Sequence, residues 1–168
     1  MPDSLSGPTG ASLNIFSGMT SRLAHTLLKD VGFSLLAEGT TIRIRADGYS
    51  MYPRIKPGSV IYIEPVNENS LPSTGEIAAL KKDSGFIVHR IVRIIEDGGK
   101  KFVVTRGDSG MEEDDPEPVS NIAGRVVKVE MPSGKAVTKK SLNKNPNYTL
   151  NRLLLRIILQ ISRLKRIL

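Results

Sequence analysis

The chain has 168 residues, of which 39% are apolar and 24% charged, a composition typical of one globular domain. It contains no cysteine, and its two histidines, His25 and His89, lie far apart. These counts exclude a disulfide scaffold, a zinc finger, an iron–sulfur cluster and a thiol nucleophile, and no metal or cofactor is expected.

The sequence contains no run of about 20 apolar residues, the length that a transmembrane helix requires. Its first residues lack the basic start and apolar core of a signal peptide. The expected location is therefore the cytoplasm or the periphery of a membrane.

The net charge of +7 is unevenly distributed. Residues 1–134 contain 15 Lys and Arg and 17 Asp and Glu, a balance of −2. Residues 135–168 contain 9 Lys and Arg and no acidic residue, a balance of +9. An anionic partner is therefore expected only for the C-terminal segment.

The first predicted element is a helix that follows a loose N-terminus. Residues 1–12 are rich in Ser, Gly and Pro and are expected to be irregular. Residues 13–37 place apolar side chains three or four positions apart, which predicts a helix that Gly39 ends. The members of this apolar face are Phe16, Met19, Leu23, Leu27 and Val31.

The central part of the chain has the pattern of a β domain. Between residues 41 and 130, short runs rich in Val and Ile are separated by turn signals that contain Gly, Pro and Asp. The runs are TIRIRA, SVIYIEP, EIAALKK, FIVHRIVRII, KFVVTRG and IAGRVVKVE. The predicted fold class is mainly β within the α+β class: a compact antiparallel domain with a helix at each end.

The C-terminal part is predicted to be a linker over residues 131–148 and a basic amphipathic helix over residues 149–168. Leucines and isoleucines fill one side of this helix, and Arg152, Arg156 and Arg163 lie opposite. Three partners for the apolar side remain open: its own domain, a membrane surface, or a groove on another protein.

Two residues are candidates for nucleophilic catalysis. Ser50 lies in GYSMYP, between two predicted strands, where glycine and proline favour a fixed, exposed turn. A serine nucleophile needs a base within hydrogen-bonding distance. Besides the lysines, His89 in the strand IVHRIV is the strongest candidate for that base, although a histidine in a strand is also often merely packed.

An imidazole base is more effective when a carboxylate orients it. Asp108 in TRGD, or Asp115 in the acidic loop that follows, would fill this role if the loop returns toward His89. The alternative is a solvated acidic loop.

Taken in order, GYSMYP, GEIAALKK, VHRIV, TRGD, DPEPV and IAGRVV resemble the motifs of the signal peptidase I superfamily, which also contains the LexA-like repressors. The resemblance covers residues 41–129. It implies a β-rich catalytic domain and, because His89 occupies the place that other branches give to lysine, the Ser–His branch of the family.

The resemblance further implies a serine endopeptidase that cleaves a precursor protein or peptide. Ser50 would be the nucleophile and His89 the general base, while Asp108 and Asp115 match two family aspartates. The transmembrane anchor that signal peptidases have before the serine motif is missing from the corresponding place.

Two other classes of function remain open. One is a catalytically silent scaffold with the peptidase fold. The other is a repressor-like dimerisation module, although the segment before the β domain is too short for a helix-turn-helix domain and nucleic acid is not an expected partner. The oligomeric state is left open.

Overall fold

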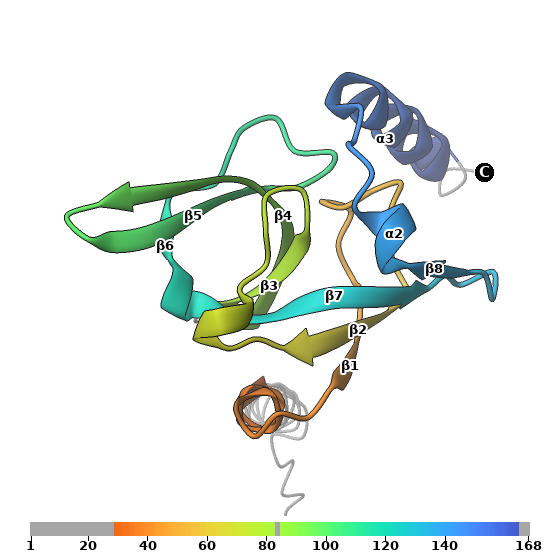
Figure 1. Ribbon diagram of the computed structural model, residues 1–168. Helices are drawn as coiled ribbons and strands as arrows, with labels where there is room; N and C mark the ends of the chain where they lie inside the picture. The colour runs from red at the N-terminus through yellow and green to blue at the C-terminus, as the bar shows by residue number, and fades with distance from the viewer. Residues whose placement is uncertain (1–28, 83–84, 165–168) are drawn as a thin grey trace, which may run out of the picture.

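The computed structural model describes residues 29–82 and 85–164 (Figure 1). Its main feature is one eight-stranded sheet in the order β1-β2-β7-β3-β4-β5-β6, with β8 paired to β7, and every pairing is antiparallel. The strands are β1 (Ile42–Arg45), β2 (Val60–Pro65), β3 (Ile77–Lys82), β4 (Gly85–Asp97), β5 (Lys100–Arg106), β6 (Glu117–Pro118), β7 (Ile122–Glu130) and β8 (Ala136–Thr138). The predicted mainly β class is thereby confirmed.

Helical segments lie around this sheet. Residues 29–37 are helical, and Gly39 follows with φ of +86°, a conformation that glycine adopts without strain. The others are the short turns η1 (Glu68–Ser70) and η2 (Val119–Asn121), and the helices α2 (Lys139–Leu142) and α3 (Tyr148–Leu164). The predicted helical residues 13–28 and 165–168, and the N-terminus 1–12, lie outside the described residues.

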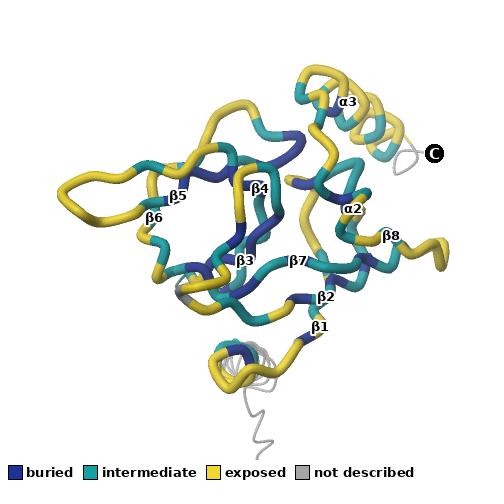
Figure 2. Tube along the Cα trace, viewed as in Figure 1, coloured by how far each residue is buried: buried dark blue, intermediate teal, exposed yellow. Residues whose placement is uncertain are grey.

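The hydrophobic core has two parts, which appear as dark stretches in Figure 2. The larger part joins Leu36 of the first helix to β1, β2, β7 and the β1–β2 connection. The smaller part lies between β3, β4 and β5 and includes Leu80, Ile91 and Val103. Val31, expected on the buried face of its helix, is instead 54% exposed.

Residues 131–148 are not the linker that their composition predicts. They contain β8, which continues the sheet beside β7, and α2, whose Leu142 is fully buried in the larger core. Arg54 fastens α2 to the β1–β2 connection, because its guanidinium donates to the carbonyls of Ser141 at 2.5 Å and Lys144 at 3.1 Å.

The helix α3 follows on the same side and projects from the sheet (Figure 1). Its one buried residue is Asn151. In the part of the chain that the structure describes, no helix has the length and apolarity needed to cross a membrane.

Candidate active site

Ser50 is exposed at the tip of the turn between β1 and β2. The next residue, Met51, is only 4% exposed and packs into the larger core together with Ile55. Two backbone bonds close the turn, from Tyr52 N to the Tyr49 carbonyl and from Ile55 N to the Met51 carbonyl, both at 2.9 Å. Burial of the flanking side chain therefore fixes the backbone while the Ser50 hydroxyl faces solvent.

A second loop supports the serine from behind. The Ser109 amide donates to the Ser50 carbonyl at 2.9 Å, and the Ser109 hydroxyl donates to the Tyr49 carbonyl at 2.7 Å. Among the described residues, the amide N–H of Ser50 itself donates to no protein group. It is therefore available to an oxyanion, which is what a serine nucleophile requires of its own backbone.

Gly107 allows this second loop to lie close to the backbone of Ser50. A Cβ at this position would lie 2.7 Å from the Ser50 carbonyl oxygen. Because that atom belongs to the backbone, Gly107→Ala is expected to displace the serine turn and to lower both thermal stability and any Ser50-dependent activity. Gly48→Ala, where a Cβ would meet nothing within 4 Å, is the control for stability measured by thermal melting. Equal melting temperatures for wild type and Gly107→Ala would contradict the expectation.

His89 lies on β4, with its side chain 16% exposed, and a carboxylate holds it. Its Nδ1 lies 2.6 Å from Oδ2 of Asp114. The same Oδ2 accepts a bond from the Thr105 hydroxyl at 2.6 Å, and the Asp114 amide donates to the Thr105 carbonyl at 2.7 Å. With Nδ1 donating to the carboxylate, Nε2 is left as the basic nitrogen.

The carboxylate that contacts His89 is thus neither of the two that the sequence favoured. Asp115 is exposed, and Asp108 is fully buried and paired with Arg90. Neighbouring residues of a strand point to opposite faces, so His89 and Arg90 each select a different aspartate from the β5–β6 loop. Asp114 was missed, because its position in the loop depends on its backbone bond to Thr105.

Asp108 is the centre of a buried polar network. Arg90 Nε and Nη2 donate to its two carboxylate oxygens, each at 2.8 Å, while Nη1 donates to the carbonyls of Gly75 at 2.6 Å and Leu142 at 3.0 Å. Asn151 of α3 donates to the Asp108 carbonyl at 3.0 Å. The network joins β4, α2 and α3 to the loop that supports Ser50, so Asp108 has a structural role next to the site.

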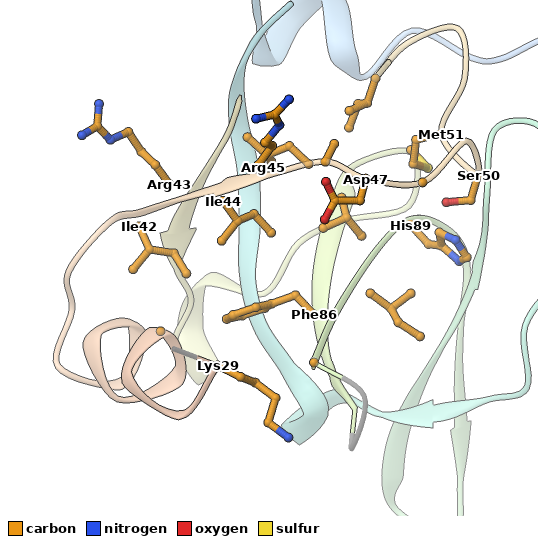
Figure 3. A pocket seen from close by; sticks show the side chains of 18 of the residues that line it. Lys29, Ile42, Arg43, Ile44, Arg45, Asp47, Ser50, Met51, Phe86 and His89 are labelled. Carbon is orange, nitrogen blue, oxygen red and sulfur yellow. The ribbon is translucent and has the colours of Figure 1, made fainter. Parts of the chain in front are cut away.

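Ser50 and His89 line the same cavity, which has a volume of about 930 Å³. Figure 3 shows their labelled side chains at one end of it, with Lys29 and Phe86 farther along. Among the described residues, no hydrogen bond joins the Ser50 hydroxyl to the ring. Such bonds are often long in an unliganded site and shorten when substrate binds. Much of the cavity wall is apolar, formed by Ile42, Ile44, Met51, Ile55, Ile61, Phe86, Ile87 and Val88.

One wall of this groove is the unpaired edge of β1. This strand pairs with β2 alone among the described strands. Ala46 exchanges backbone bonds with Gly58 and Ser59 on the β2 side. Because the backbone groups of an antiparallel strand alternate in direction, the N–H and C=O groups of Arg43 and Arg45 are directed outward along the groove.

The opposite wall is the first part of β4. Its pairing with β5 begins at Arg90, so within the described residues Gly85–His89 pair with β3 alone. Ile91 exchanges backbone bonds with the β3 side, and alternation from this residue directs the N–H and C=O groups of Phe86 and Val88 away from β3. The groove therefore lies between two strand edges whose outward hydrogen-bonding groups have no strand partner among the described residues.

Comparison with known proteins adds no assignment, because no family model and no curated protein matches the chain.

In the described part of the chain, no group of three or more His, Asp or Glu side chains is arranged to hold a metal ion.

Proposed function

We propose that the protein is a serine endopeptidase of the signal peptidase and LexA-like type, which cleaves a peptide bond in an extended segment of a precursor protein or peptide. One observation carries the proposal. In the part of the chain that the structure describes, an exposed serine and a histidine held by Asp114 share one end of a groove between two strand edges that pair with no further strand.

The proposed reaction is acyl transfer. The Ser50 oxygen attacks the peptide carbonyl while His89 Nε2 takes its proton, and the Ser50 amide donates to the oxyanion. His89 then gives the proton to the leaving amine, and an acyl ester remains on Ser50. Water, deprotonated by the same nitrogen, cleaves the ester and restores the serine. Asp114 stabilises the imidazolium that forms in each half of the reaction.

The shape of the groove indicates how a substrate binds. An extended peptide inserted between β1 and β4 would accept and donate backbone bonds on both sides, as in the addition of a strand to a sheet. Alternate side chains of such a peptide would face the apolar wall near Ile44, Met51 and Val88. Apolar side chains at the alternate positions that face this wall are therefore preferred.

The proposal is tested by incubating the purified protein with a mixed peptide library and identifying new termini by mass spectrometry. The wild type is expected to cut peptides that have apolar side chains at alternate positions near the cut, and His89→Ala is expected to be inactive. Equal inertness of wild type and variant would favour the scaffold function. Equal cutting by both would exclude His89 as the base.

The two neighbouring aspartates provide a matched pair of variants. Asp114→Asn is expected to lower the rate of cleavage by about 10²- to 10⁴-fold, because the amide no longer stabilises the imidazolium. Asp115→Asn makes the same chemical change at an exposed neighbour and is expected to keep the wild-type rate. Rates are compared on one peptide from the library. A greater loss for Asp115→Asn would contradict the assignment of Asp114.

A further inference from the structure

The helix α3 has three distinct faces. One face contains Asn151, which is buried and bonds to the domain, and the partly buried Leu155, Ile158 and Ser162. At about 100° per residue, a second face is apolar and a third carries the arginines. The apolar face consists of Leu150, Leu153, Leu154, Ile157, Ile161 and Leu164, and the basic face of Arg152, Arg156 and Arg163.

The apolar face has no cover within the described chain. Leu153 is 55% exposed, Ile157 44% and Leu164 62%. Helices of this kind usually bury their apolar side, and a contiguous exposed apolar surface marks an interaction site. The domain contacts a different side of the helix, so docking onto its own domain does not account for this face.

The charge of the C-terminal segment indicates which kind of surface the apolar face of α3 contacts. Residues 135–168 contain nine basic residues and no acidic one. A helix with an apolar side and arginines beside it is suited to lie in the plane of an anionic bilayer, with leucines among the acyl chains and guanidinium groups at the phosphates. A second copy of the chain would instead bring a further charge of +9 close to the first.

The helix is also held firmly at its start. Asn151 donates to the Asp108 carbonyl at 3.0 Å, and the Tyr148 ring lies 3.9 Å from the Arg106 guanidinium. Asn147 caps the first turn by accepting a bond from the Leu150 amide at 3.0 Å. Burial, together with the charge of Asp108, raises the pKa of Tyr148, in keeping with a packed ring. The exposed face therefore has a defined orientation relative to the domain.

We propose that α3 is a membrane-surface anchor, which binds an anionic lipid bilayer through Leu150, Leu153, Leu154, Ile157, Ile161 and Leu164 and through the arginines beside them. The proposal does not depend on peptidase activity. It concerns a different surface of the protein, and its test measures lipid binding alone.

The test is flotation of the full-length protein with vesicles of phosphatidylcholine and phosphatidylglycerol, in comparison with phosphatidylcholine alone. The wild type is expected to float with the mixed vesicles and much less with the neutral ones. Ile157→Asp places a charge in the middle of the apolar face and is expected to weaken binding by about tenfold or more.

Leu159→Asp is the matched control. Leu159 lies on the same helix among the arginines and is 37% exposed, and the substitution changes the net charge by the same amount. It is expected to float nearly as well as the wild type. Thermal melting verifies that both variants are folded. Equal loss for the two variants would show that only charge matters and would overturn the role of the apolar face.

Sedimentation in the absence of lipid tests whether a second copy of the chain covers the apolar face instead. The proposal requires a wild type that floats and an apolar face that is free in solution. A dimer that Ile157→Asp dissociates, combined with failure to float, would overturn it and would assign the face to a second copy of the chain. Failure of a monomeric wild type to float would overturn it as well.

Discussion

Ser50→Ala is expected to reduce peptide cleavage by about 10³-fold or more, to the background of the assay, because no other group at that position supplies a nucleophilic oxygen. The folded state should be unaffected. Ser50 is exposed, its side chain makes no hydrogen bond with the described residues, and the turn is fixed by Met51 below it. Loss of activity without loss of stability is therefore the expected result, measured on one library peptide and by thermal melting.

Ser120→Ala, a change of another exposed serine, is the control and should retain the wild-type rate. A Ser50→Ala protein that still cuts at the same position would exclude Ser50 as the nucleophile. A mass increase on Ser50 after a brief reaction that is quenched with acid, corresponding to the acyl half of the peptide, would identify the ester directly.

Arg90→Leu is expected to have the largest effect on stability, a loss of about 3–5 kcal/mol in the free energy of unfolding. Arg90 is 1% exposed and Asp108 is fully buried, so the substitution leaves a carboxylate without a counter-charge inside the protein. It also leaves the carbonyls of Gly75 and Leu142 without their donor. For a domain of this size, such a loss is a large part of the total stability.

Arg93→Leu is the control on the same strand. Arg93 pairs with Glu113, but both side chains are exposed, and surface pairs of this kind contribute about 0–1 kcal/mol. Urea unfolding, monitored by circular dichroism, measures both variants. If Arg90→Leu unfolds at the same urea concentration as Arg93→Leu, the buried pair is not what joins β4, α2 and the serine loop.

The strands could be predicted because their signal is local. Runs such as SVIYIEP and IAGRVVKVE alternate or cluster apolar residues between turn signals, and each forms the strand expected of it. Residues 131–148 could not be predicted in the same way. Their composition is that of a linker, and long-range contacts keep them on the domain: the pairing of β8 with β7, the burial of Leu142 and the bonds from Arg54.

The candidate site likewise has residues that could be predicted from the sequence and others that could not. Ser50 and His89 could be singled out from the sequence because Ser50 lies in a turn between Gly48 and Pro53 and His89 is one of two histidines in the chain. The structure places both on one cavity. The sequence did not indicate which aspartate contacts His89. That contact depends on the alternation of His89 and Arg90 along β4 and on the bond that fixes the loop at Thr105.

The open edge of β1 has a consequence for the protein's behaviour in concentrated solution. An unpaired strand edge can template pairing with another molecule, which is a common route to aggregation. On β1, Arg43 and Arg45 are exposed and occupy alternate positions. If two molecules paired through this edge in antiparallel fashion, their arginines would meet arginines, and like charges opposite each other are unfavourable. The strand edge that the proposed substrate would occupy thus disfavours pairing with a second copy of the chain.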